Sequence, residues 1–173
     1  MRPSELAREE FVAAFGQVFE HSAWIAGRTW DKGLGPRQDS LQGLHDAFGE
    51  VIREAGRREQ MALLQAHPEL AAGEAEGEDL TPHSQDEQRG AGLDRCRPEE
   101  FAEFQRLNGT YRDTFGFPFI IAVKGLDRRQ ILETFRSRLR NTREAEFREA
   151  LEQVIRIGYF RLKGIFPGGT GQP

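Results

Sequence analysis

A histidine followed by a proline interrupts an otherwise helical pattern at His67-Pro68. Because proline disfavours the helical conformation of the residue before it, we expect His67 to lie at the carboxyl end of a helix. The helix dipole favours a protonated imidazole there, which makes His67 a candidate general acid or base near neutral pH. The alternative is a structural or surface histidine, which is the commoner role of this residue type.

Ser84 and Glu87 form a second polar group, three residues apart at the expected start of the next helix. Their spacing fits the S-x-x-E capping box, in which both side chains satisfy backbone donors and need no other function. In the functional alternative, this helix start offers amides and a hydroxyl to an anion while Glu87 orients the His67 imidazole. The two interpretations compete for the Glu87 carboxylate.

Arg161 is the most informative charged residue of the last predicted helix. At about 100° per residue it falls on the same side as Phe147, Leu151, Val154 and Gly158, which is the core-facing side. A guanidinium there must be paired. A buried salt bridge or a side chain that extends to solvent would explain it without function. The functional alternative is a bidentate clamp for a substrate carboxylate.

The stretch Phe115 to Val123 alternates phenylalanine with Gly116 and Pro118 before an apolar run. Pro118 would remove a hydrogen-bond donor from a strand, and no partner strand is evident, so we expect a buried, irregular extended segment between helices. Core filling explains its composition. The backbone amides of such a segment still need partners, which are other protein groups, water or a ligand.

Amphipathic helices that position these residues account for most of the remaining chain. We expect them at 4–24 with a break at Gly16, 40–56, 57–66, a short one from Ser84, 98–116, 128–140 and 142–166. Residues 27–38 are expected to form a loop or short turns around Trp30, and 71–79 a mobile loop that could act as a lid. The pattern predicts an all-α, single-domain helical bundle over 1–166 and a flexible C-terminal tail at 167–173.

The charge balance excludes several classes of partner. The chain has 173 residues, with 24 basic and 28 acidic side chains, so it lacks the cationic surplus that binds nucleic acid. No run approaches the roughly 20 apolar residues of a membrane span, and the N-terminus lacks the apolar core of a signal peptide. We therefore expect a small-molecule or protein partner and a cytoplasmic location.

Metal and thiol chemistry are also disfavoured. Cys96 is the single cysteine, so it makes no internal disulfide and no zinc site by itself. His21, His45 and His83 show no metal-ligand spacing, and Cys96 has no histidine nearby in the sequence to activate it. We expect no metal site.

The chain resembles the OHCU decarboxylases of ureide metabolism over nearly its whole length. The residues that carry the resemblance are Phe19 to Trp24, His67 to Ala71, Leu80-Thr81, Ser84, Glu87-Gln88, Ala91 to Leu93, Phe104, Leu107-Asn108, Tyr111, Phe115 to Ile120, Ile131-Leu132, Arg138-Leu139, Asn141 and Ile157 to Leu162. Each motif alone is weak, but their occurrence in order is specific.

This resemblance implies an all-helical, commonly dimeric enzyme that converts 2-oxo-4-hydroxy-4-carboxy-5-ureidoimidazoline to S-allantoin without cofactor or metal. It implies His67 as the catalytic acid or base and Glu87 as its partner. The remaining implied site residues contact the substrate or line its pocket: Pro68, Ser84, Phe117, Phe119, Ile120 and Arg161. Two other functions stay open, a non-catalytic helical module that binds a ureide or another small anion, and a purely structural bundle.

The sequence departs from the family pattern at three places. Glu69 stands where aspartate is usual after His-Pro, and residues 72–75 replace a common Gly-Lys or Gly-Arg continuation. Cys96 occupies a position that is more often leucine. The basic residue lost after the His-Pro motif would affect loop closure, whereas the implied catalytic set is intact.

Overall fold

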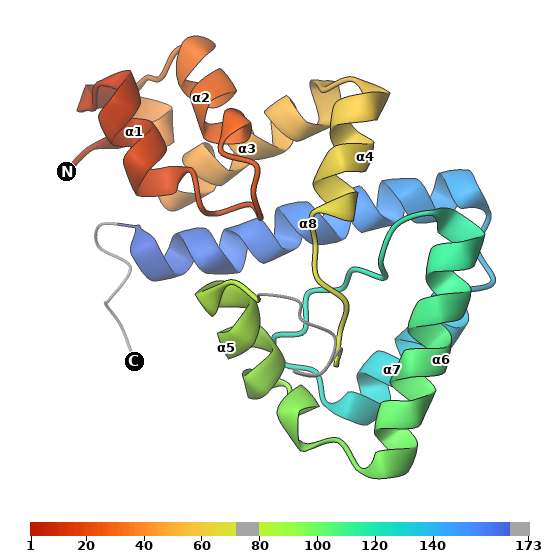
Figure 1. Ribbon diagram of the computed structural model, residues 1–173. Helices are drawn as coiled ribbons and strands as arrows, with labels where there is room; N and C mark the ends of the chain where they lie inside the picture. The colour runs from red at the N-terminus through yellow and green to blue at the C-terminus, as the bar shows by residue number, and fades with distance from the viewer. Residues whose placement is uncertain (72–79, 167–173) are drawn as a thin grey trace. The chain divides into compact units, whose positions relative to one another are not determined.

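The fold is known from a computed structural model that describes residues 1–71 and 80–166. These residues form helices joined by turns and irregular segments and contain no strand, which confirms the all-α prediction (Figure 1). The expected lid at 71–79, apart from Ala71, and the expected tail lie outside the described residues.

Contacts within the chain cluster into two compact units, Met1–Ala66 with Val154–Pro173, and His67–Gln153. We call them the first and second unit and describe each by itself. The chain passes from one to the other at His67 and again within its longest helix, α8 (Arg143–Ile165). The single domain expected from the sequence stays a prediction.

The first unit contains four complete α-helices, two 3-10 helices and the C-terminal part of α8. They are η1 (Pro3–Glu5), α1 (Arg8–Phe15), α2 (Trp24–Asp31), η2 (Pro36–Asp39), α3 (Leu41–Glu54) and α4 (Arg57–Gln65). Helix α1 packs against α2, and α2 against α3. The core of this unit includes an aromatic cluster in which Phe19 meets Phe48 edge to face, with ring centroids 5.7 Å apart.

The break expected at Gly16 is confirmed, because Gly16 closes α1; the helical start at Ser4 and the continuation to Trp24 are wrong, because α1 begins at Arg8 and the next helix begins at Trp24. Ser4 caps no helix of this kind; its amide and hydroxyl donate to the Asp39 carboxylate at 2.8 and 2.7 Å. His21 lies in the left-handed region at φ 48°, which ends any helix in that region.

Helix α2 was also missed, because residues 27–38 were expected to be a loop. Three glycines and several charges in this stretch hide a helix that long-range contacts stabilise. Gly27 packs closely on α1, since an added Cβ would lie 2.8 Å from Arg8 Nη2. Trp30 is a packing residue, as expected, and its indole donates to the Leu6 carbonyl at 3.0 Å.

The second unit contains α5 (Pro82–Gly90), η4 (Leu93–Arg95), α6 (Pro98–Phe115), α7 (Arg128–Arg138) and the N-terminal part of α8. Several predicted boundaries are confirmed. Pro98 begins α6 and Gly116 ends it in the left-handed region at φ 83°. The Asp127 carboxylate caps α7 by accepting from the Gln130 amide at 2.8 Å.

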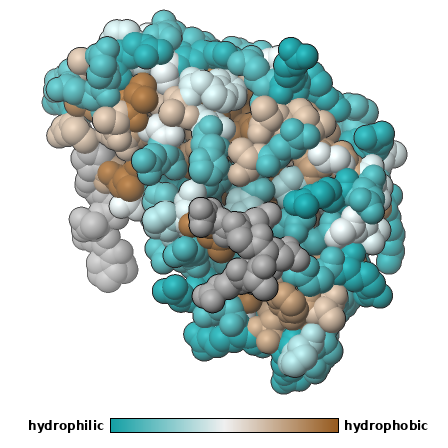
Figure 2. Space-filling model, viewed as in Figure 1, coloured by the Kyte–Doolittle hydropathy of each residue, from teal (hydrophilic) through white to brown (hydrophobic). Residues whose placement is uncertain are grey.

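The outer surface carries few large apolar side chains. Figure 2 shows a face that is mostly hydrophilic with scattered apolar patches. Among the described residues, the exposed large hydrophobic side chains are Met1, Phe101 and Ile165. No helix in the described part of the chain has the length and hydropathy needed to cross a membrane.

Candidate active site

His67 begins the second unit and follows Ala66, which closes helix α4. The prediction that His67 lies at a helix carboxyl end is therefore confirmed. Its side chain is buried, as are those of Glu69 and Leu70, while Pro68 is half-buried. The imidazole thus belongs to an irregular segment that is nevertheless part of the protein interior. We call residues 67–71 the His67 segment.

Side-chain amides from two helices hold the backbone of the His67 segment. On α5, Gln88 donates to the Glu69 carbonyl and accepts from the Ala71 amide, both at 3.1 Å. On α6, Asn108 donates to the Leu70 carbonyl at 2.9 Å. These contacts replace the hydrogen bonds that regular secondary structure would provide, so the segment has a fixed path.

An ion pair adds a further anchor for the His67 segment. The carboxylate of Glu69 lies 2.6 Å from Nη2 of Arg112 on α6, and its side chain is only 7% exposed. Glu69 is the residue that departs from the aspartate usual in the family.

Ser84 and Glu87 do not form the capping box that their spacing suggests. Helix α5 begins at Pro82, and the hydroxyl of Thr81 caps it by accepting from the Ser84 amide at 3.3 Å. Ser84 is thus inside the helix, two residues after its start, and the prediction that it begins the helix is wrong. The physical reason is local: threonine followed by proline is a strong helix start, because proline is preformed for the first helical position.

This correction changes what α5 presents to the rest of the second unit. Residues four apart share a helix face, so Ser84 lies on the same face as Gln88. Both are buried, and Gln88 binds the His67 segment, so this face of α5 is turned toward that segment. Glu87, next to Gln88, is half-buried. The sequence prediction that Ser84 and His67 belong to neighbouring elements is consistent with this arrangement.

The predicted irregular segment is confirmed: residues 117–123 form neither helix nor strand, and all of them are buried. The Arg138 guanidinium of α7 donates to the Ile120 carbonyl and lies over the Phe119 ring, 4.5 Å from its centroid. Phe119 also stacks on Phe135 with ring centroids 3.9 Å apart. Further along, the Ala122 amide donates to the Gln153 side chain at 2.9 Å.

Glu146 organises the charges behind this segment. Its fully buried carboxylate accepts from Arg138 Nε at 2.5 Å, the Tyr111 hydroxyl at 2.9 Å and the Asn141 amide at 3.0 Å. Burial raises the pKa of Tyr111, so its phenol stays protonated and remains a donor. The carboxylate thus accepts three hydrogen bonds, and Arg138 links it to the Ile120 carbonyl.

Three consecutive backbone amides of the segment 117–123 differ from the Ala122 amide in their hydrogen bonding. Within the described residues, the N–H groups of Phe119, Ile120 and Ile121 make no hydrogen bond. All three residues are buried. Buried backbone donors are normally satisfied, so donors of this kind suit a ligand that carries negatively charged oxygen. Phe119 and Ile120 are among the site residues expected from the sequence.

Arg161 lies in the first unit and is buried, as its place on the helical wheel predicts. Its Nη2 atom lies 3.0 Å from the Glu20 carboxylate, and Nη1 donates to the Val18 carbonyl at 3.2 Å. The buried salt bridge weighed as an explanation for this residue is therefore present. All other predicted site residues belong to the second unit.

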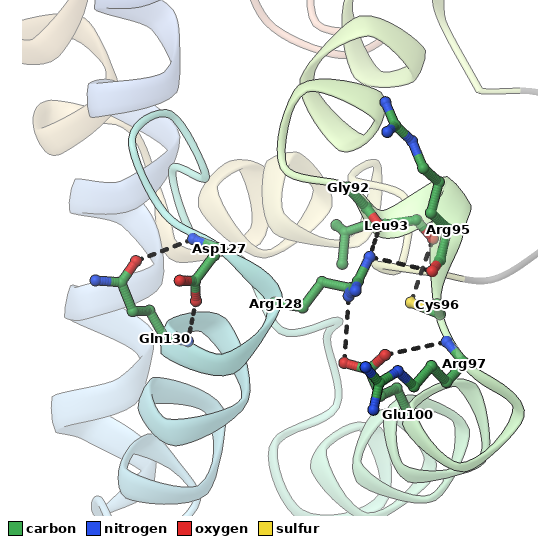
Figure 3. A network of polar contacts seen from close by, with 9 residues as sticks. All are labelled: Gly92, Leu93, Arg95, Cys96, Arg97, Glu100, Asp127, Arg128 and Gln130. Atoms are coloured by element: carbon green, nitrogen blue, oxygen red, sulfur yellow. Dashed lines mark hydrogen bonds and ion pairs between the residues drawn. The ribbon is translucent and has the colours of Figure 1, made fainter.

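A further cluster fixes the turn that follows α5. Figure 3 shows Arg128 of α7 donating from Nη1 to the carbonyls of Gly92 and Arg95, at 3.0 and 3.1 Å, and from Nε to Glu100 at 3.2 Å. Gly92 has φ 76°, a conformation that favours glycine. Arg128 of α7 therefore ties the turn after α5 and helix η4 to α6.

Cys96 is half-buried in the segment that precedes α6. Burial raises the pKa of the Cys96 thiol, which donates to the Leu93 carbonyl at 3.4 Å (Figure 3). No group of three or more His, Cys, Asp or Glu side chains in the described ranges could hold a metal ion.

Sequence reasoning assigned no contacts to five buried polar residues that the structure places against predicted site residues or segments, namely Glu20, Gln88, Asn108, Arg138 and Glu146. One signal was available for Asn108, which shares the apolar face of α6 with Phe104 and Tyr111 and so had to find a buried partner. The partners of the other four depend on contacts between elements, which spacing does not show.

Comparison with known proteins adds independent information. Residues 4–163 match the family model described as OHCU decarboxylase. A 2-oxo-4-hydroxy-4-carboxy-5-ureidoimidazoline decarboxylase from Halalkalicoccus jeotgali is 42% identical over 156 residues, which cover 90% of this chain and 85% of that protein. The match therefore includes both units.

Solved structures show the same architecture. The crystal structure of an (S)-allantoin synthase superposes with a TM-score of 0.74 at 27% identity and covers 95% of this chain. The chain spans about half of that protein, 52% of its length. A crystal structure of an OHCU decarboxylase in the presence of (S)-allantoin has a TM-score of 0.66 at 20% identity and covers 93% of this chain and 99% of the other, which supports the fold.

Proposed function

Because the chain belongs to the OHCU decarboxylase family, we propose that it converts 2-oxo-4-hydroxy-4-carboxy-5-ureidoimidazoline to S-allantoin and carbon dioxide. The match of the family model over residues 4–163 carries this proposal. The reaction belongs to urate catabolism and is a carboxy-lyase reaction. Its substrate is a small molecule, so binding it requires no cationic surplus over the whole chain.

The chemistry of the substrate explains why side chains suffice. The carboxylate leaves from a ring carbon that stands next to a C=N bond, so the electron pair of the broken C–C bond moves into that system. The ring nitrogen of that C=N bond takes up one proton, a second proton adds to the carbon that bears the ureido group, and the neighbouring hydroxyl loses its proton and becomes a carbonyl. The protein needs to position the ring, stabilise charge and deliver the proton to one face.

The roles of the residues follow from the proposal. His67 manages the proton, and Glu87 orients the imidazole. Ser84 and Arg161 bind oxygen atoms of the substrate, while Pro68 and Phe117 contribute apolar walls. The amides of Phe119, Ile120 and Ile121 are suited to an anionic oxygen, because rigid donors aimed at developing charge lower the barrier.

Kinetics with freshly generated substrate test the proposal. The purified chain is expected to form allantoin faster than the spontaneous reaction, and His67→Ala is expected to remove this acceleration. His83→Ala is the matched control, because His83 is half-buried on α5 and has no assigned role. A wild-type rate equal to the spontaneous one would overturn the enzymatic function. If allantoin still raised the melting temperature, the chain would be the binding module instead.

The proposal includes a homodimer, as the family resemblance implies, and a cytoplasmic location. The unpaired, half-buried Cys96 is compatible with a reducing compartment. Sedimentation equilibrium at several protein concentrations tests the dimer, and a mass of 19.7 kDa throughout would identify a monomer.

A further inference from the structure

The environment of Arg161 is built from one short stretch near the start of the chain. The Glu20 carboxylate lies 3.0 Å from Nη2, and the side chains of the two residues are 3% and 1% exposed for Arg161 and Glu20 respectively. The Val18 carbonyl accepts from Nη1 at 3.2 Å. A charged side chain and a backbone carbonyl thus contact two different nitrogen atoms of the same guanidinium.

A glycine on α8 allows this stretch to approach. Gly158 precedes Arg161 by three residues, so the two positions share one helix face. An added Cβ at Gly158 would lie 2.6 Å from the Phe19 ring, which no real Cβ tolerates. Phe19 therefore occupies the space of the missing side chain and places its two neighbours, Val18 and Glu20, against the face that carries Arg161.

The backbone on the other side of Glu20 is also constrained. His21 adopts a positive φ of 48°, which is uncommon for a residue with a side chain. The Ser22 hydroxyl donates to the Glu20 carbonyl at 2.8 Å. The position of the carboxylate is therefore set by a packed ring before it and a hydrogen-bonded turn after it.

Stability alone does not account for such a pair. The desolvation of two buried charges offsets most of their attraction, so a well-packed apolar pair would be equally stable or more stable. The charge pair does fix orientation, because a guanidinium is rigid and planar, and holding one edge aims the whole fork. This property matters where an arginine must bind an anion in one geometry.

We propose that Glu20 is a positioning residue for the decarboxylation, which, together with the Val18 carbonyl, aims the Arg161 guanidinium at an anionic oxygen of the substrate. This inference rests on the proposed function, in which Arg161 binds the substrate. Glu20 itself does not touch the reacting atoms. Gly158 contributes to the same arrangement, because its lack of a side chain leaves room for Phe19 beside α8.

A carboxylate-to-amide exchange tests the proposal. Glu20→Gln keeps the size of the side chain but removes the charge that holds Arg161, so kcat/KM is expected to fall by about 10–100-fold, since small misplacements of binding groups are costly. Glu20→Asp is expected to recover part of this loss. The control is Glu59→Gln, which removes the partner of Arg28, at 2.6 Å in the same unit, and is expected to leave kcat/KM unchanged.

Chemical rescue separates positioning from mere folding. In Arg161→Ala, added guanidinium ion is expected to restore part of the activity, because the Glu20 carboxylate and the Val18 carbonyl still bind it. In the double variant Arg161→Ala with Glu20→Gln, the rescue is expected to be lost. The double variant leaves no uncompensated buried charge, so it folds even where Glu20→Gln alone does not.

The outcomes are distinguishable. An inactive wild-type chain would overturn the proposed function and this inference with it. An active wild type in which Glu20→Gln matches Glu59→Gln, or in which guanidinium rescues both Arg161→Ala variants equally or neither, would overturn the inference alone. Rescue confined to the variant that retains Glu20 would support it.

Discussion

The His67 segment and the Arg161 guanidinium are held by opposite kinds of interaction. Neutral amides hold the backbone of the first, with Gln88 and Asn108 bonding to residues 69–71. A buried carboxylate holds the side chain of the second through Glu20. Neutral side-chain amides fix the path of the backbone by satisfying its hydrogen-bonding groups. An ion pair fixes the direction in which the guanidinium points, and this suits arginine because its side chain stays charged.

Among the proposed variants, the loss of a buried charged partner should reduce stability most. Glu146→Ala removes the carboxylate that pairs with Arg138 and accepts a hydrogen bond from the Tyr111 hydroxyl. The Arg138 guanidinium then stays in the interior without this partner. Unfolding in urea is expected to show a loss of about 3–5 kcal/mol. Glu133→Ala, which breaks the exposed pair with Arg129, is the control and is expected to change stability by less than about 1 kcal/mol. Equal losses in both variants would contradict the importance of buried charge.

Removing one of the neutral side-chain amides that hold the His67 segment should have a smaller effect on stability. Gln88→Ala leaves the Glu69 carbonyl and the Ala71 amide without their partner, so the expected loss is about 2–3 kcal/mol. The catalytic rate should fall as well, because the path of the His67 segment is then unfixed. Gln85→Ala, an exposed glutamine of the same helix, is the control. A Gln88→Ala variant as stable and active as Gln85→Ala would show that the Gln88 hydrogen bonds contribute to neither stability nor activity.

The ion pair at Glu69 should contribute least among the anchors of the His67 segment. Arg112 is half exposed, at 53%, so solvent screens the pair although Glu69 itself is buried. Arg112→Gln is expected to cost about 1 kcal/mol or less in a thermal or urea unfolding measurement. A loss larger than that of Gln88→Ala would reverse the order of neutral and charged anchors in this segment.

A pH titration sharpens the distinction between charged and neutral contacts at the surface of the first unit. Hydrogen bonds from the Ser4 amide and hydroxyl lower the pKa of Asp39. Its contribution is therefore present above the unfolded pKa of about 4 and is lost as the pH falls through the lower folded pKa. Wild type is expected to melt above Asp39→Asn near neutral pH and together with it in strong acid. A constant difference at all pH values would contradict this assignment.

The fold was largely predictable where local signals mark helix ends. Ser40, Asp127, Pro98 and Gly116 mark boundaries that the structure confirms, because each acts on backbone groups within a few residues. Helix α2 was not predictable in this way, since its glycine-containing sequence is stabilised by contacts distant in the chain.

The candidate site was also predictable only where local signals determine the structure. The place of His67 at a helix end and the inward face of Arg161 follow from proline chemistry and helical period. Ser84 was misplaced because its S-x-x-E spacing was favoured over the Thr81-Pro82 start beside it. Glu20 and Gln88 could not be assigned partners, because those partners lie in other elements and spacing within one element contains no record of them.

The central claim is that His67 delivers a proton to one face of the substrate, and the optical purity of the product tests it most directly. Circular dichroism of fresh reaction mixtures should show an excess of S-allantoin with the wild-type chain. With His67→Ala it should show no excess, at the spontaneous rate. A wild-type product without optical activity, or a His67→Ala variant that keeps both the rate and the S excess, would contradict the account.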